Sequence, residues 1–236
     1  MEKFFVANWK MNKGDDDGLA LLQQMTTLHI KGKCAAIICP PYTLLGAAQQ
    51  VFEHTNFYLG AQNCSGYNAG AYTGEISAHM VRMMGATAVI LGHSERRQHF
   101  NETSSMVKEK ACRAIEQSLL PIICVGESLD DYEKNKTLEV VRTQIEASVP
   151  SQNSPFLIAY EPVWAIGSGK IPKNDEIQEA VQYIEGLFQE PRPILYGGSV
   201  SPENIENIIK IPSISGVLVG GSSLDLEKTK AMLDAF

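Results

Sequence analysis

The chain has 236 residues, 44% of them hydrophobic and 20% charged, with a formal net charge of −7 at pH 7. This length suits one large barrel or two small domains with a sizeable core. The negative balance argues against nucleic acid or an anionic membrane surface as a partner, while a local site for a small anion stays compatible with it.

The chain also lacks the usual signs of membrane insertion or export. No apolar run approaches the roughly 18 residues of a membrane-spanning helix, and the N-terminus has no signal-peptide stretch. The five cysteines, Cys34, Cys39, Cys64, Cys112 and Cys124, show no paired metal-ligand spacing. Their odd number and wide spread indicate reduced thiols. We therefore expect a cytoplasmic protein without a metal site.

Short apolar runs recur along the chain and are typical of buried strands. They cover residues 4–7, 35–39, 57–61, 88–91, 121–125, 156–160, 194–196 and 216–219, and their starts lie 22 to 38 residues apart. That spacing accommodates one strand and one crossover helix. The runs are continuously apolar rather than alternating, as expected for strands covered by helices.

Amphipathic helical patterns fill most of the gaps between these runs. Predicted core-facing stripes are Leu19, Leu22 and Met25; Met106, Cys112, Ile115 and Leu119; Leu138, Val141, Ile145 and Val149; and Ile177, Val181, Ile184 and Phe188. Predicted helix starts lie at residues 15–17, 174–175, 201–203 and 225, where polar caps or a proline occur.

Eight βα units without a long linker predict a single (β/α)8 barrel domain spanning residues 1–236. A doubly wound open sheet is the alternative. The G-x-G-x-x-G phosphate fingerprint of such sheets is absent after the first strand, where Asn8-Trp9-Lys10-Met11-Asn12 stands instead.

Polar side chains follow the predicted strands at their carboxyl ends. They are Asn8 and Lys10, Gln62 and Asn63, His93, Glu127, Glu161, Ser199, and the run Gly220-Gly221-Ser222. In a barrel these ends converge on one mouth, where barrel enzymes build their active sites. We therefore expect these residues to come together.

The segment 159–170 carries the strongest chemical signal. Glu161 ends an apolar strand, and Pro162 biases it toward extended backbone. The loop that follows holds Trp164, Ile166 and two glycines, Gly167 and Gly169, so it can cover a site and approach a ligand closely. The alternative is a surface carboxylate that caps the next turn.

Lys10 and His93 suit the stabilisation of a developing oxyanion. Lys10 is interpreted either as a fixed cation or as a surface lysine. His93 lies at a predicted helix start, whose dipole disfavours the imidazolium ion, so a neutral N–H donor is expected; a core histidine is the alternative. Glu95 is interpreted either as an ion-pair partner of Lys10 or Arg96 or as a catalytic group.

Two glycine-rich turns predict a phosphate site. Residues 196–200 and 219–223 each bring glycines and a serine to the junction of a strand and a helix. Backbone N–H groups and a hydroxyl there can hold a phosphate, as barrel loops seven and eight often do. The alternative is that the glycines only make tight turns.

Together these segments resemble the triosephosphate isomerase family over essentially the whole chain. The matching stretches are residues 8–12, 92–97, 160–170, 196–200 and 218–221. The resemblance implies interconversion of dihydroxyacetone phosphate and glyceraldehyde 3-phosphate without metal or organic cofactor. A glutamate base, a neutral histidine and a closing lid are well-known features of this family, and they come to this chain with the resemblance.

The resemblance also assigns roles. Glu161 is the base, His93 the electrophile, Lys10 the electrostatic stabiliser and Asn8 an orienting group. Gly167, Ser199, Gly220 and Gly221 receive the phosphate. The lid comprises Ala165, Ile166, Gly167, Ser168, Gly169 and Lys170, and Ile166 and Leu218 form an apolar clamp on Glu161.

A homodimer is implied by the same resemblance. The loop 62–75, which includes Thr73 and Glu75, matches the family's dimer loop, and Thr73 would approach the Asn12 side of the site in a second copy. A solvated loop is the alternative. Ser168 replaces a usual threonine, and Pro172 fixes its φ beyond the lid, which predicts a stiffer second hinge and altered lid kinetics.

Two other functions are compatible with parts of the sequence. In an aldolase-like barrel, Lys10 would act as a Schiff-base nucleophile. A sugar-phosphate binding module would keep the glycine-rich cradle and tolerate loss of Glu161.

Overall fold

A computed structural model of the chain describes residues 3–30, 32, 34–151, 153–167 and 172–236. Within these residues, eight parallel strands close into a barrel in chain order. They are β1 (Lys3–Asn8), β2 (Cys34–Cys39), β3 (Phe57–Ala61), β4 (Ala88–Leu91), β5 (Leu120–Val125), β6 (Leu157–Tyr160), β7 (Ile194–Tyr196) and β8 (Ile214–Val219). β1 pairs with both β2 and β8, which excludes the open sheet.

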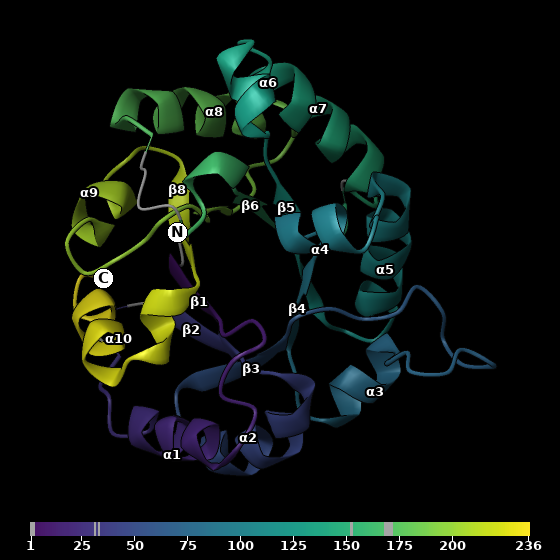
Figure 1. Cartoon of the computed structure of the whole chain (residues 1–236), viewed down its shortest axis with the longest axis vertical. Helices are drawn as coiled ribbons and strands as arrows, with labels where there is room; N and C mark the ends of the chain where they lie inside the picture. The colour runs from purple at the N-terminus through teal and green to yellow at the C-terminus, as the bar shows by residue number, and fades with distance from the viewer. Residues whose placement is uncertain (1–2, 31, 33, 152, 168–171) are drawn as a thin grey trace.

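The helices surround the strands (Figure 1). They are α1 (Asp16–Met25), α2 (Leu45–Phe52), α3 (Ala78–Met83), α4 (Ser94–His99), α5 (Ser104–Glu116), α6 (Leu129–Glu133), α7 (Thr137–Ser148), α8 (Asn174–Gly186), α9 (Ile205–Ile209) and α10 (Leu226–Leu233). Short 3₁₀ turns occur at η1 (Tyr42–Leu44), η2 (Val163–Ala165) and η3 (Gly221–Leu224). The predicted barrel class is therefore confirmed.

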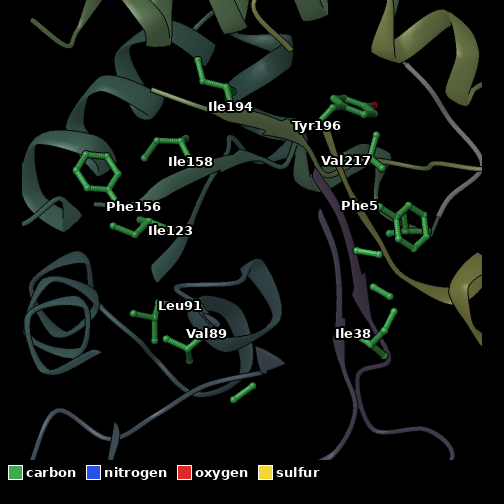
Figure 2. Packing of buried hydrophobic residues seen from close by; sticks show 14 of the residues in the cluster. Phe5, Ile38, Val89, Leu91, Ile123, Phe156, Ile158, Ile194, Tyr196 and Val217 are labelled. Atoms are coloured by element: carbon green, nitrogen blue, oxygen red, sulfur yellow. The ribbon is translucent and has the colours of Figure 1, made fainter. Parts of the chain in front are cut away.

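Successive strand residues face opposite sides of the barrel wall. Phe4 and Val6 of β1 belong to a buried cluster inside the barrel, together with Ala159 and Leu218. Phe5 of β1 belongs to the larger cluster between strands and helices. Figure 2 shows side chains of this outer cluster, contributed by most of the strands. The period of two explains why the strand sequences are apolar throughout, since both faces are buried.

The predicted strand runs match the observed strands to within two residues at each end. The stripes on α7 and α8 are confirmed at Val141, Ile145, Ile177, Val181 and Ile184, which are all buried. Leu138 and Phe188 are only half-buried, and Val149 and Phe188 lie beyond the ends of these helices. In α1 the buried face contains Leu22 and Met25 as predicted, while Leu19 is half-buried.

The predicted stripe on α5 is wrong. Met106 is exposed, and Cys112 and Ile115 are only half-buried, whereas Leu119 is buried but lies beyond the end of the helix. The core-facing residues are Val107, Lys110, Ala111 and Ala114. α5 packs against α7 and β5 through this small-residue face. The prediction followed the largest apolar side chains of α5, which lie on a different face of the helix from the buried residues.

The helix-start predictions differ in accuracy. The carboxylate of Asp225 accepts a hydrogen bond from the N–H of Lys228 at 2.9 Å and caps α10, and residues 174–175 begin α8. Asp15 precedes α1, but its side chain makes no capping hydrogen bond. The start predicted at 201–203 is too early, because α9 begins at Ile205 after a turn.

We predict that Gly216→Ala destabilises the barrel. A Cβ at Gly216 would overlap the backbone oxygen of Phe4, so β1 and β8 would have to separate. Forced packing of this kind costs about 1–3 kcal/mol of unfolding free energy. The measurement is urea unfolding of the variant and the wild type.

Gly186→Ala is the matched control for this change. Gly186 is the last residue of α8, and nothing lies within 4 Å of its added Cβ. Replacing a helical glycine at an open position stabilises a protein by about 0.4–1 kcal/mol. Equal stability of the two variants would contradict the proposed strand clash.

Candidate active site

The alternation along the strands carries two polar side chains to the mouth of the barrel. Val6 and Ala159 face the interior, so Asn8 and Glu161, two residues further along, continue the inward-facing rows. Both are buried, Asn8 at 5% and Glu161 at 2% exposure. At the neighbouring position after β7 stands Gly197, where a Cβ would lie 2.7 Å from Cγ of Glu161. A larger residue there would displace the glutamate.

His93 is the N-cap residue of α4 and is buried. Its Nδ1 accepts a hydrogen bond from the backbone N–H of Glu95 at 3.2 Å. A ring nitrogen that accepts carries no proton, so this bond assigns a neutral imidazole with its proton on Nε2. Nε2 lies 3.4 Å from Oε1 of Glu161. The predicted neutral donor is thus compatible with the hydrogen bonding observed.

Lys10 is held in an uncommon backbone conformation, with φ at 54°. Its N–H donates to Oδ1 of Asn8 at 3.0 Å, and its carbonyl accepts from Nε2 of Gln62 at 2.8 Å. Its ammonium pairs with Oε1 of Glu95 at 2.5 Å. Contacts at both ends therefore fix the direction in which this side chain leaves the backbone, as expected where local strain is maintained at a site.

Glu95 lies close to both the Lys10 ammonium and the His93 ring. Besides pairing with Lys10, its Oε2 lies 3.6 Å from Nδ1 of His93. Its side chain remains partly open to solvent. The ion pair anticipated between Glu95 and Lys10 is present, whereas Arg96 pairs with Glu102 through its Nε at 3.0 Å.

A cavity of about 310 Å³ opens at the carboxyl ends of the strands, and we call it the main cavity. Its lining residues come from the loops after β1, β4, β6, β7 and β8: Asn8, Lys10, His93, Ile166, Gly167, Gly198, Ser199, Val200, Ser201, Asn204, Leu218, Gly220, Gly221 and Ser222. It brings together an amide, an ammonium, an imidazole and glycine-rich backbone, a set suited to an anionic substrate bearing a carbonyl.

Glu161 lines a neighbouring second cavity of about 160 Å³, together with Ser94, Arg97, Cys124, Gly126 and Gln144. Its Oε2 accepts from the N–H of Ser94 at 3.3 Å, while Oε1 has no hydrogen bond among the described residues. Burial, followed by the charge and hydrogen bonding of Glu161, raises the pKa of the Cys124 thiol well above its ordinary value. The carboxylate is thus next to His93 but turned from the main cavity.

The predicted phosphate ligands all line the main cavity. Gly220 and Gly221 stand at the junction of β8 and η3, and a Cβ at Gly221 would meet nothing within 4 Å. Ser199 is already engaged, because its hydroxyl donates to the carbonyl of Ala165 at 2.5 Å. The Ser199 carbonyl accepts from Nδ2 of Asn204 at 3.0 Å. These bonds link the turn after β7 to the beginning of the predicted lid.

The predicted lid is described only in part. Ala165 is buried at the end of η2, and Gly167 is exposed with φ at 64°. Ile166, Gly167 and Leu218 line the main cavity, whereas Glu161 lines the second one. The predicted lid residues Ser168, Gly169 and Lys170 lie outside the described part of the chain.

Glu127 was expected at the mouth, but it does not line the main cavity and belongs instead to a buried network. Its carboxylate accepts from Nε1 of Trp164 at 2.8 Å and from the hydroxyl of Tyr160 at 3.3 Å. Burial raises the pKa of Glu127, and these donors counteract it. In the sequence, this network could have been found from the acidic Glu127 after β5 and the indole of Trp164 in the loop after β6. The network ties the start of the lid segment to β5.

Arg97 is a residue for which the sequence predicted no role. Its guanidinium donates to the carbonyls of Gly92 at 2.7 Å and Cys124 at 3.2 Å, and to the hydroxyls of Ser104 at 3.0 Å and Ser148 at 3.2 Å. Burial lowers the pKa of this guanidinium. Arg97 therefore joins the turn that carries His93 to β5 and to α7.

The described residues contain no cluster of three or more His, Cys, Asp and Glu side chains able to hold a metal ion. Of the helices that the structure describes, none is both long and apolar enough to cross a bilayer.

The (β/α)8 barrel carries a lysine and an imidazole in a cavity with glycine-rich turns, and a buried carboxylate lies next to the imidazole. This combination is typical of barrel enzymes that act on small phosphorylated carbonyl compounds. A family model described as "Triosephosphate isomerase" matches residues 3–236. The chain belongs to the triosephosphate isomerase family.

Individual relatives agree with this assignment. A triosephosphate isomerase of Alkaliphilus oremlandii is 42% identical over 97% of both chains. One of Wolbachia pipientis wMel is 43% identical, covering 96% of this chain and 91% of the relative. The crystal structure of triosephosphate isomerase from Bartonella henselae has a TM-score of 0.92 and 34% identity, covering 100% of this chain and 99% of the other.

We predict that Glu127→Gln changes how stability depends on pH. A carboxyl whose folded pKa is raised above the ordinary 4.5 favours the folded state fully below that value, and the contribution is lost as pH rises through the folded pKa. The wild-type unfolding free energy, minus that of the variant, should therefore fall as pH rises from about 4.5.

The measurement is urea unfolding of both proteins at several pH values. Glu190→Gln, which removes an exposed carboxyl, is the control. A wild-type-minus-variant difference for Glu127→Gln that stays constant, or that rises with pH, would contradict a raised pKa.

Proposed function

We propose that this chain interconverts dihydroxyacetone phosphate and D-glyceraldehyde 3-phosphate without a cofactor. Membership of the family supports the reaction. The observation that carries the residue assignments is the main cavity, because Lys10, His93 and Asn8 line it together with the glycine-rich turns after β7 and β8. A triose phosphate needs an anion cradle at one end and oxyanion donors at the other.

The reaction is a proton transfer between adjacent carbons. Glu161 removes a proton from the carbon next to the carbonyl, the carbonyl π electrons move to oxygen, and an enediolate forms. Glu161 then returns the proton to the neighbouring carbon, while the hydroxyl proton on the first carbon's oxygen passes to the other oxygen, a transfer proposed to run through Nε2 of His93. His93 donates its Nε2–H to the oxygens, and Lys10 stabilises their negative charge. One well-placed donor in an oxyanion site contributes about 3–4 kcal/mol to barrier lowering.

Glu161 must turn toward the main cavity to act as the base. In the structure its Oε2 accepts from the N–H of Ser94, while its Oε1 lacks a hydrogen bond among the described residues and lies 3.4 Å from Nε2 of His93. We propose that substrate binding draws the carboxylate from Ser94 to the substrate. Enclosure by Ile166 and Leu218, the proposed clamp, then keeps it poorly solvated and basic.

The phosphate is proposed to bind at Gly167, Ser199, Gly220 and Gly221. The Ser199 hydroxyl, which donates to Ala165 in the structure, would exchange this partner for the phosphate. The lid formed by residues 165–170 would exclude water and protect the enediolate from phosphate elimination. Altered lid kinetics through Pro172 stay a prediction.

Asn8 is proposed to orient the substrate and also supports Lys10. For Glu95, the ion pair with Lys10 favours a structural role, in which it holds the ammonium in place. The same pair argues against the Schiff-base alternative, which requires a free amine at Lys10. A pure binding module has no need for a buried Glu161 beside a neutral imidazole.

We propose further that residues 1–236 form one domain and that the protein works in the cytoplasm as a homodimer. Continuous barrel closure supports the first point. The absence of nucleic-acid or membrane partners rests on the charge of −7. For the dimer, the loop between β3 and α3 projects from the barrel (Figure 1), and residues 67–75 on it are exposed. Met11, beside Lys10, is 97% exposed and offers an apolar contact.

We predict that Glu161→Gln lowers kcat in a coupled isomerase assay by about 10²–10⁴-fold, because the amide cannot accept the proton. Inhibition by inorganic phosphate should be unchanged, since the proposed cradle is intact. Glu190→Gln is the control for loss of a carboxyl. Normal turnover of the Glu161 variant would rule out Glu161 as the base, and loss of wild-type turnover in chelator would rule out cofactor-free catalysis.

The dimer proposal predicts that Thr73→Arg produces monomers. Thr73 and Glu75 lie in the exposed part of the loop, and a long charged side chain at Thr73 opposes insertion into a second copy. Sedimentation velocity at micromolar concentration measures the change, and Thr143→Arg on the exposed face of α7 is the control. A wild-type chain that sediments as a monomer, or a dimeric Thr73→Arg variant, would refute this interface.

A further inference from the structure

The backbone at the end of β5 is hydrogen-bonded to the segment that carries Glu161. The carbonyl of Val125 accepts from the N–H of Glu161 at 2.8 Å, and the carbonyl of Glu127 accepts from the N–H of Val163 at 3.0 Å. Gly126 stands between these two contacts. The position of the proposed base therefore depends on where the backbone of residues 125–127 lies.

Gly126 is in direct contact with the backbone of Glu161. A Cβ at Gly126 would overlap the carbonyl oxygen of Glu161 and lie 3.3 Å from its Cα. The two main chains thus pack with no room for any side chain. Any shift of the Gly126 peptide toward β6 must move Glu161 with it.

A side-chain amide from α7 holds Gly126 at both of its backbone groups. Oε1 of Gln144 accepts from the N–H of Gly126 at 2.8 Å, and Nε2 of Gln144 donates to the carbonyl of Gly126 at 3.1 Å. Gln144 is half-buried and lines the second cavity together with Glu161. This paired contact replaces the ladder bonds that Gly126 lacks, since β5 ends at Val125.

We propose that Gln144 is a positioning residue for Glu161. It holds the Gly126 peptide against the Glu161 backbone, so that the carboxylate starts from a defined depth when it moves to the substrate. The inference rests on the proposed role of Glu161 as the base. Gln144 does not line the main cavity, so it acts on the reaction only through Gly126 and Glu161.

The first test is Gln144→Leu, which keeps a similar volume but removes both hydrogen bonds. Misplacement of a catalytic group by about 1 Å costs up to about 10²-fold in rate. We expect kcat per folded molecule to fall by about 10–100-fold. KM should stay within about twofold, because the proposed phosphate cradle follows β7 and β8.

Gln182→Leu is the matched control, since it makes the same change at an exposed position of α8. Far-UV circular dichroism and urea unfolding give the folded fraction of each variant. A kcat for Gln144→Leu equal to that of Gln182→Leu would overturn the proposal, as would a rise in KM with unchanged kcat.

The second test is Gln144→Glu, which makes the contact with Gly126 depend on pH. If Gln144 only stabilised the fold, the turnover of this variant per folded molecule would not follow the protonation of the new side chain. A protonated glutamic acid reproduces the amide, because its carbonyl accepts from the Gly126 N–H and its hydroxyl donates to the Gly126 carbonyl. The ionised form repels that carbonyl. Arg97, Asp131 and Glu161 are the charged groups lining the same cavity. Two carboxylates against one guanidinium, together with burial, favour the protonated form.

We expect the kcat of Gln144→Glu, divided by the wild-type kcat, to approach one near pH 5 and to fall about tenfold or more by pH 9, as the introduced carboxyl ionises above its ordinary pKa of about 4.3. Taking the ratio removes the pH dependence that the two proteins share. A ratio that is flat across this range would overturn the proposal.

The two layers of inference fail separately. Normal turnover of Glu161→Gln would reject the proposed base, and with it the function assigned to Gln144. A deeply impaired Glu161→Gln beside Gln144 variants that behave like Gln182→Leu would reject only the positioning role.

Discussion

The alternation of side chains around a closed barrel is the constraint on which the site depends. Closure makes one face of every strand interior, so the rows that contain Val6 and Ala159 end in Asn8 and Glu161 at a common mouth. A bulky residue where Gly197 stands would occupy the volume of the Glu161 side chain. The absence of a side chain at Gly197 therefore leaves the space that the Glu161 side chain occupies, and the proposed chemistry depends on both residues.

Much of the fold follows from local patterns in the sequence. Continuously apolar runs marked each strand, because both faces of the wall are buried. The error on α5 shows the limit of the approach. Its buried face consists of Val107, Lys110, Ala111 and Ala114, and a buried lysine is invisible to an apolar stripe. Lys110 is accommodated there because its ammonium pairs with the buried Glu102 and donates to Oδ1 of Asn63 at 3.0 Å.

The site was predictable to the extent that it lies at strand ends. Lys10, His93, Asn8, Ser199 and both glycines after β8 line one cavity, as the convergence of parallel strands implies. Glu161 was expected at the same opening as Lys10 and His93. It lies next to His93 but lines the second cavity, because its carboxylate is turned toward the N–H of Ser94. That rotation, and the bonds made by Gln144 and Arg97, depend on side chains from distant elements. Residue spacing in the sequence does not predict them, because each depends on the side-chain rotamer and on partners that only the closed barrel brings into reach.

The charges and hydrogen bonds in the main cavity limit the roles that its residues can take. The ammonium of Lys10 is paired with Glu95, and Nδ1 of His93 accepts a backbone N–H. For the proposed phosphate, the backbone N–H groups of Gly220 and Gly221 are short-range donors, and the Lys10 ammonium is close to them, 3.8 Å from the position that a Cβ at Gly220 would take. Glu161 is proposed to carry the proton between the carbons, and a proton carrier must be placed accurately relative to both of them. The contacts behind Glu161, at Gly126 and Gln144, determine where its backbone lies, so under this proposal they affect catalysis as well as stability.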